Sequence, residues 1–222
     1  MQERGMPKLT EKRKRIMAYF IEATQKLIRT EGIDGLSIRK IAAEAGYNSA
    51  TIYHYFHDLE HLALFGSVCY LREYILELSR TLTEQMNSFE RYCTIYRCFN
   101  RVAIDEAEIY HTLFFGRYRH MLGEVLRVYY GELFPEELQG LDDNMKKMLM
   151  SGTMLERDRV TMENMVKEGF VAPEKAEITL ELVIAAHQNF LYEAYTQGEA
   201  LNREAHLGKF EQQMLYLLKA AK

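Results

Sequence analysis

The stretch Ser37–Phe56, SIRKIAAEAGYNSATIYHYF, predicts two short helices joined by a tight turn. Its first half repeats apolar or small residues at the spacing of one helix face, namely Ile38, Ile41, Ala42 and Ala45. Gly46 comes next, at a place where a residue that tolerates positive φ commonly ends a helix. Either Asn48 or Ser49 can then cap a second helix with its side-chain oxygen. Such a pair is the helix-turn-helix arrangement, whose second helix can enter the major groove of DNA.

The second predicted helix combines an apolar inner side with a polar outer side. Ile52 and Phe56 recur four residues apart and can pack back on the first helix. Side chains that can reach phosphates or base edges occupy the outward positions: Asn48, Ser49, Thr51, Tyr53, His54 and Tyr55. The pattern by itself leaves open an ordinary antiparallel helix pair that does not contact DNA.

The order of residues in this stretch is more specific than the helix-turn-helix pattern alone. Residues Ile41–Phe56 closely resemble the DNA-binding signature of the tetracycline-repressor (TetR) family. That signature begins with Ile-Ala, two variable residues and Ala-Gly, followed by a run of small residues. It continues with Thr, a hydrophobic residue and Tyr, and it ends with two polar or aromatic residues and Phe. The resemblance covers roughly the first quarter of the chain, and the rest is similar to the family only in length and helical character. It implies a homodimeric transcriptional regulator, a repressor that a small-molecule ligand releases from a palindromic operator.

One position departs from the family pattern. The family often has Lys three residues after the signature Phe, where it touches phosphate, and here that position is Leu59. We therefore expect the contact to be lost, or to be supplied by His54, His57 or the basic N-terminal arm. A helical adaptor protein that has lost specific DNA reading stays as an alternative on this ground.

Composition bounds the fold class. The chain has 222 residues, only three prolines and no run of alternating β-branched residues, so we expect an all-α protein. We place a three-helix helix-turn-helix DNA-binding domain with a basic arm at 1–57, and a helical ligand-binding and dimerisation domain at 58–222. No apolar run is long enough to span a bilayer and the N-terminus lacks the apolar core of a signal peptide, so we expect a cytoplasmic protein with no membrane partner.

Charge is distributed unevenly along the chain. The net charge is −4, but residues 1–40 contain ten Lys or Arg against five Asp or Glu, which gives +5 and leaves −9 for the remainder. A basic head on an acidic body suits a protein that meets DNA with one end. We expect the run Lys12–Arg15 to add phosphate contacts. The predicted DNA-contact set is Ser37, Arg39, Lys40, Asn48, Ser49, Ala50, Thr51, Tyr53, His54 and Tyr55.

Apolar periodicity predicts the remaining helices. We expect a first helix at about 10–30, and a single long fourth helix at about 58–86 whose tilt would set the distance between two reading heads. Further helices are expected within 88–131, as a loop and short helix at 136–152, and at 153–168, 173–197 and 202–220. Of the three cysteines, Cys69, Cys93 and Cys98, none has zinc-pair spacing, and buried thiols or a redox sensor are the two interpretations.

Aromatic and Met side chains with a few polar groups concentrate in the 90–190 region, which is the composition of a ligand cavity. The candidate ligand-binding residues are Tyr96, Asn100, His111, Phe115, Arg119, Met154, Arg157 and His187. A hydrophobic or flat ligand is favoured, while Arg119 and Arg157 would suit an anion. A filled core whose polar groups are merely satisfied is the alternative, and periodicity does not separate the two.

The last two predicted helices are rich in apolar residues, and such a pair can be an interface as easily as a core. In the family that the motif resembles, the last two helices pair with those of a second subunit in a four-helix bundle. The resemblance therefore implies a dimer interface that includes Phe190, Leu191, Phe210, Met214 and Leu217. A two-fold dimer is also expected because one short recognition helix reads few bases.

Enzymatic function is the rival class. The sequence has no Gly-rich phosphate loop, no nucleophile elbow and no metal motif with proper spacing. Glu106 and Glu108 are two apart and are expected on different sides of a helix. His54, His57 and His61 have metal-ligand spacing, but a chain break near His57 would scatter them. We expect no catalytic residues, no cofactor and no metal site.

Overall fold

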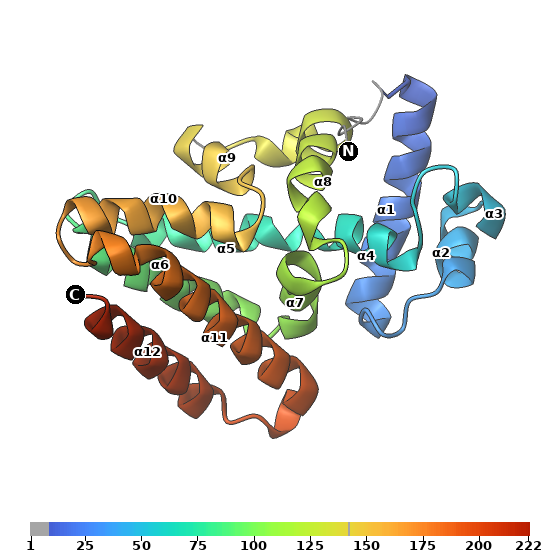
Figure 1. Ribbon diagram of the computed structural model, residues 1–222. Coiled ribbons are helices and arrows are strands. Elements are labelled where there is room, and N and C mark those ends of the chain that lie inside the picture. Colours follow the sequence, from blue (N-terminus) through green and yellow to red (C-terminus); the bar gives the residue numbers. More distant parts are fainter. Residues whose placement is uncertain (1–8, 142) are drawn as a thin grey trace.

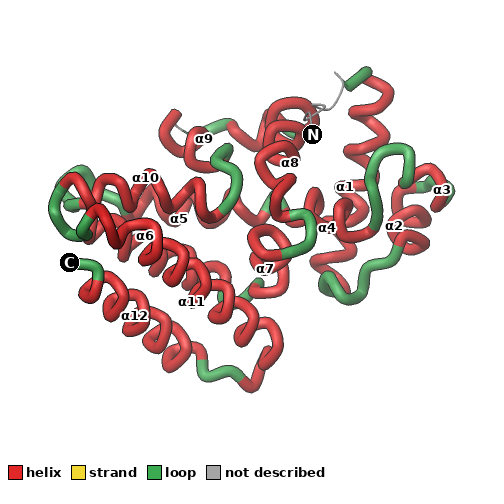
Figure 2. Tube along the Cα trace, in the orientation of Figure 1, coloured by secondary structure: helices red, strands yellow, loops and turns green. Residues whose placement is uncertain are grey.

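Helices make up the regular structure of the computed structural model, which describes residues 9–141 and 143–222 (Figures 1 and 2). Within those residues no strand occurs, and the predicted all-α class is confirmed. The N-terminal helices are α1 (Glu11–Glu31), α2 (Ile38–Ala45) and α3 (Ser49–Ile52). The α-helices that follow are α4 (Leu59–Ser67), α5 (Tyr70–Thr81), α6 (Ser88–Ala103), α7 (Ala107–Phe115), α8 (Leu122–Val128), α9 (Asp143–Leu149), α10 (Met154–Lys167), α11 (Ala176–Gln197) and α12 (Arg203–Ala220).

Local capping fixes the helix-turn-helix as the sequence predicts. The Ser37 hydroxyl accepts a hydrogen bond from the N–H of Lys40 and starts α2. Gly46 ends α2 in the left-handed conformation, at φ 74° and ψ 30°, which glycine adopts without a steric penalty. Of the two candidate caps for α3, the structure selects Asn48, whose Oδ1 accepts from the N–H of Ala50 at 2.8 Å.

The predicted single fourth helix is wrong: it is two helices, and the second ends at Thr81. Between α4 and α5 the backbone tightens, because the N–H of Leu71 bonds to the carbonyl of Val68 instead of the residue four positions back. Two tyrosine hydroxyls from other helices hold carbonyls at this junction. Tyr130 donates to the carbonyl of Val68 at 3.2 Å, and Tyr110 donates to the carbonyl of Tyr70 at 2.8 Å.

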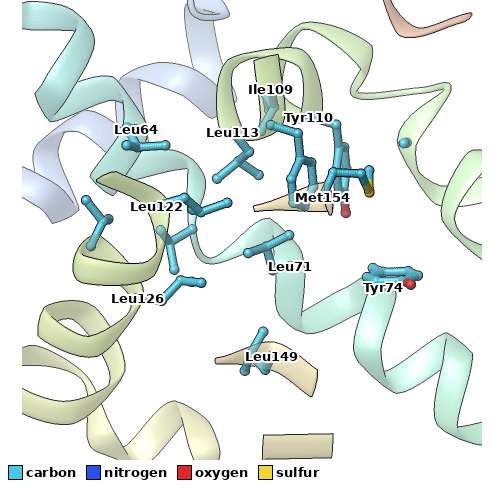
Figure 3. Packing of buried hydrophobic residues seen from close by; sticks show 14 of the residues in the cluster. Leu64, Leu71, Tyr74, Ile109, Tyr110, Leu113, Leu122, Leu126, Leu149 and Met154 are labelled. Atoms are coloured by element: carbon cyan, nitrogen blue, oxygen red, sulfur yellow. The ribbon is translucent and has the colours of Figure 1, made fainter. Parts of the chain in front are cut away.

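Close packing joins α4 to α1. A Cβ placed on Gly66 in α4 would lie 2.6 Å from Cγ2 of Thr24 in α1, so the two backbones approach more closely than a larger residue permits. Farther along, buried side chains from several helices meet around the start of α5. Figure 3 shows Leu71 facing Leu113 of α7 and Leu122 of α8. This core ties the N-terminal helices to the rest of the molecule.

The remaining helices form a layered body beside the N-terminal three (Figure 1). Two of them, α6 and α10, start with capping boxes at Asn87 and Thr153, in which side chain and backbone bond reciprocally. The long helices α11 and α12 run side by side at one face, and α7 lies between α11 and the N-terminal helices (Figure 1). The helices predicted at 153–168, 173–197 and 202–220 are confirmed within a few residues.

Candidate nucleic-acid interface

The helices α2 and α3 and the segments beside α3 carry exposed side chains, most of them polar or aromatic. Arg39, Asn48, Ala50, Tyr53 and His54 are all exposed, and Tyr53 shows 59% of its surface to solvent although it is a large aromatic residue. Arg39 makes no ion pair with any described residue. Gly46 ends α2 in the left-handed conformation before α3 begins, and Ile52 anchors α3 because it is fully buried. We refer to these five residues as the reading face.

Other members of the predicted DNA-contact set already have structural partners. Nζ of Lys40 lies 2.5 Å from Oε2 of Glu31 and donates to the carbonyl of Gly35 at 2.8 Å. Ser37 uses its hydroxyl as the cap of α2, and Ser49 and Thr51 are half-buried. Lys40 and Ser37 hold the helix-turn-helix together, and so does Oδ1 of Asn48 as the cap of α3. The side chains of Arg39, Tyr53 and His54 are exposed and form no hydrogen bond or ion pair with a described residue.

Arg13 has a role that sequence reasoning missed. Its Nη2 donates to the carbonyl of His54 at 3.0 Å, and its guanidinium lies 4.7 Å from the centroid of the Tyr55 ring. Tyr55 packs in turn against Phe20 of α1. Arg13 therefore holds the segment after α3 in place through His54 and Tyr55. The basic run in the sequence did not predict that one of its arginines has a buried side-chain nitrogen, Nε.

The basic run Lys12–Arg15 is thus divided between two uses. Lys14 pairs with Glu132 at 2.7 Å and with Glu11 at 3.2 Å, and these carboxylates raise its pKa. Lys12 and Arg15 are exposed on α1. The expectation that all four residues contact phosphate is corrected: the structure leaves two of them available.

The start of α4 is acidic and already engaged. Leu59 is half-buried against the core, so it does not mimic the lysine of the family pattern. Asp58 caps the helix through the N–H of His61 at 3.0 Å, and it also accepts from Tyr118 at 2.7 Å and from Arg117 at 3.2 Å. Burial lowers the pKa of His61 to about 4, so this ring is neutral at neutral pH. No group of three His, Cys, Asp or Glu side chains within 9–141 and 143–222 is arranged to hold a metal ion.

A small cavity lies between α5, α6, α7 and α10. It measures about 50 Å³, and Tyr96, Met154 and Arg157 are the three predicted ligand residues that line it. The Tyr96 hydroxyl bonds to the carboxyl of Asp158. Burial raises the pKa of Asp158 to about 7, although the Tyr96 bond and the Arg157 charge act in the opposite direction. Arg157 is half-buried, donates to the carbonyls of Ser151 and Leu149, and lies over the Phe114 ring.

The other predicted ligand residues do not line this cavity. Nε2 of His187 lies 2.7 Å from Oδ1 of Asn100 within an aromatic cluster, and burial lowers the pKa of His187 to about 3. Phe115 packs near His187 and His111, which is half-buried. Arg119 is exposed in the turn Arg119–Met121 that follows α7. Arg119 was predicted as one of the polar groups in an aromatic- and Met-rich region, but it lies beyond the end of α7 at Gly116 and is exposed.

The predicted interface residues of α11 and α12 are largely core. Four of the five are buried within the chain: Phe190, Leu191, Phe210 and Met214. The prediction is corrected for these four because α11 and α12 pack on each other and on the body through them. Only Leu217 remains half-exposed.

A different part of the same two helices is apolar and exposed. Ile178 and Leu182 on α11 show 53% and 46% of their surface, and Tyr216 on α12 shows 73%. Ala186 and Leu217 lie beside Tyr216 and help to line a shallow groove. These five residues, the α11–α12 face, follow helical spacing on α11 at 178, 182 and 186. Of these five residues, the sequence predicted only Leu217 as part of an interface, because both sides of α11 are apolar and do not show which side is exposed.

The fold and the reading face define a helix-turn-helix protein of the DNA-binding class. Residues 20–64 match the family model described as bacterial regulatory proteins, tetR family, which confirms the resemblance given by Ile41–Phe56. No curated relative matches the chain.

Two solved structures are similar to the whole chain. One, described as a TetR-family transcriptional regulator from Mesorhizobium loti MAFF303099, has 16% identity, a TM-score of 0.51, and coverage of 96% of this chain and 98% of its own. The other, described as a transcriptional regulator from Pseudomonas aeruginosa PAO1, has 16% identity, a TM-score of 0.51, and coverage of 100% and 98%. At this identity they establish the fold. Within the described residues, no helix has the length and hydrophobicity needed to cross a membrane.

Proposed function

We propose that the protein is a homodimeric transcriptional regulator that binds a palindromic operator, and that a small-molecule effector releases it. The observation that carries this proposal is the reading face, in which polar and aromatic side chains are exposed on a helix-turn-helix. Residues 1–57 would form the DNA-reading domain, and residues 58–222 would form the effector and dimerisation domain. As a regulator that binds an operator, the protein would act in the cytoplasm.

The reading face divides the work of DNA recognition. Tyr53 and His54, with the Asn48 amide, would reach base edges in the major groove, and Arg39 would contact phosphate or a guanine edge. Lys12 and Arg15 on α1 would add phosphate contacts from the side. Because α3 spans only Ser49–Ile52, one subunit reads few bases and two subunits are needed for useful specificity.

The α11–α12 face supports the second subunit. Two long adjacent helices that expose Ile178, Leu182 and Tyr216 offer a self-complementary surface for a two-fold pair. Isolated exposed hydrophobic residues are ordinary, but a cluster at helical spacing is typical of an interface.

A matched pair of tyrosines tests the dimer. Tyr216 and Tyr53 are both exposed, at 73% and 59%. Tyr216→Glu should sediment as a monomer and lose operator affinity, while Tyr53→Glu should remain a dimer and lose only operator affinity. If Tyr216→Glu sediments like the wild type, the α11–α12 face is not the dimer interface.

The effector site has weaker support. The cavity beside Tyr96 and Met154 is lined mainly by aromatic and aliphatic side chains, with the buried acid Asp158 and the half-buried Arg157 among them. Its volume of about 50 Å³ is below that of a drug-sized site. An effector would have to enlarge it, which the flexible Met154 side chain permits. The same cavity touches α5 through Tyr74, so enlargement would push on the helix that follows the α4–α5 junction.

Selection of duplexes from a random pool tests DNA reading. The purified protein should enrich a palindrome, and Arg39→Ala and His54→Ala should each weaken binding to it. Absence of enrichment at low salt would favour a helical adaptor protein instead. That outcome would direct attention to the start of α4, where Leu59, Asp58 and Glu60 present no cation of their own to phosphate.

A further inference from the structure

A second and larger cleft lies away from the Tyr96 cavity. Its volume is about 600 Å³, within the range of sites for small organic molecules. Three segments that are distant in sequence enclose it: the end of α1 with the following loop, the corner between α6 and α7, and the turn between α11 and α12. Figure 1 shows α7 between α11 and the N-terminal helices, which is where these segments meet.

The floor of the cleft is apolar. Ile28 of α1, Ile104 of the corner after α6 and Ile109 of α7 contribute to the lining, and each side chain is nearly buried. Tyr195 of α11 adds an aromatic wall and is 36% exposed. A ligand with an apolar body would find matching surface here.

The rim of the cleft is acidic. Glu106, Glu108 and Glu199 line it, together with Asp105. Among the described residues that line the cleft, Arg203 is the only basic one, and it is paired with Asp105 at 2.6 Å. The three glutamates are therefore left without a basic partner in the lining.

The two glutamates of the α6–α7 corner face one space. Their spacing in sequence predicted different sides of a helix, but Glu106 precedes the first residue of α7 and Glu108 lies in its first turn, so both line the cleft. Burial raises the pKa of Glu106, and Asp105 and Glu73 add to the effect. Burial also raises the pKa of Glu108, as does Asp34, although backbone N–H groups of Ile33 and Asp34 act against it. A cation in the cleft would relieve this repulsion.

We propose that the cleft enclosed by α1, the α6–α7 corner and the α11–α12 turn binds an organic cation with an apolar body. The cation would lie among Glu106, Glu108 and Glu199, with its apolar groups on the isoleucine floor and its charge near the Tyr195 ring. This site is distinct from the Tyr96 cavity, and its binding does not depend on whether the protein binds DNA.

A pair of probes that differ in charge but share one shape tests the proposal. Isothermal titration calorimetry on the full chain, without DNA, would compare tetraphenylphosphonium with tetraphenylborate. We expect saturable binding of one tetraphenylphosphonium per subunit and no binding of tetraphenylborate. The double variant Glu106→Gln/Glu108→Gln should weaken tetraphenylphosphonium binding at least tenfold. The matched control Glu163→Gln, on the exposed side of α10, should leave binding unchanged.

Three results would overturn the proposal: no heat with tetraphenylphosphonium up to millimolar concentration, equal binding of tetraphenylborate, or unchanged affinity in the double variant. If the double variant loses its helical circular dichroism, Glu199→Gln replaces it, because Glu199 lies in the exposed turn after α11 and should weaken binding by about threefold or more. If tetraphenylphosphonium does not bind but the duplex selection enriches a palindrome, the cation site is wrong and the proposed regulator function is still supported.

Discussion

The phenolic hydroxyl of Tyr118 donates a hydrogen bond of 2.7 Å to Oδ2 of Asp58. Asp58 is also the cap of α4, and Tyr118 belongs to the turn that follows α7, so the bond joins the body of the protein to the helix that leaves the reading segment. Burial opposes ionisation of Asp58, but the His61 N–H, the Tyr118 hydroxyl and the Arg117 charge outweigh it and lower the pKa of this carboxyl.

Tyr118→Phe removes this bond and keeps the ring. Because the acceptor is a carboxylate, we expect a loss of about 1–2 kcal/mol in the free energy of unfolding, measured by urea titration at pH 7. Tyr53→Phe serves as the control in the absence of DNA, since Tyr53 is exposed and its hydroxyl has no hydrogen bond to any described residue. Equal stability of the two variants would show that the Tyr118–Asp58 bond does not contribute.

Arg13 and Arg15 should differ although they are neighbours in one basic run. Arg13→Ala frees the His54 carbonyl and the Tyr55 ring, so we expect roughly tenfold weaker operator binding with the same salt dependence. Arg15→Ala removes a phosphate contact, so the slope of log affinity against log salt should fall by about one. Fluorescence anisotropy over a salt series distinguishes the two, and identical slopes in both variants would contradict this assignment.

Asp158 gives a pH dependence of stability whose sign is fixed. Burial raises its pKa from 3.8 to about 7 in the folded chain, so the folded chain binds this proton more tightly than the unfolded chain does. The stabilisation is complete below about pH 4 and is lost as the pH rises through 7. Between pH 8 and pH 6 the wild type should gain about 1.4 kcal/mol relative to Asp158→Asn, measured by urea unfolding at both values. A constant difference between the two proteins would show that Asp158 is already ionised at pH 6.

Gly66 should be intolerant of any side chain. Gly66→Ala places a methyl group 2.6 Å from Cγ2 of Thr24, and relief requires α1 and α4 to separate. We expect a loss of about 1–3 kcal/mol in the free energy of unfolding. Gly131→Ala is the matched control, because a Cβ there meets nothing within 4 Å. Thermal melts of the two variants should differ by several degrees, and coincident melts would mean that the α1–α4 contact relaxes without cost.

The helix-turn-helix could be predicted from sequence because its determinants are local. The residues that cap these helices act on backbone groups within three or four positions, and they are Ser37, Gly46, Asn48 and Asp58. The amino-acid sequence alone therefore indicates where each helix begins or ends. The order and approximate bounds of the C-terminal helices were accessible for the same reason.

The features that could not be predicted from the sequence depend on contacts between distant segments. The α4–α5 junction is held by Tyr110 and Tyr130, which follow it by about forty and sixty residues. On α11 both sides are apolar, so periodicity did not tell the buried Phe190 from the exposed Leu182. The acidic cleft forms only when α1, the α6–α7 corner and the α11–α12 turn come together, and none of the three carries a motif.

Equilibrium binding to the selected palindrome and to a shuffled duplex of the same composition, over a series of salt concentrations, tests most directly whether the reading face reads DNA. We predict that the palindrome binds at least about a thousandfold more tightly at physiological salt, and that the slope corresponds to several phosphate contacts. Tyr53→Glu should abolish the preference while the protein stays a dimer. Equal affinity for both duplexes, or no binding even at low salt, would contradict the account.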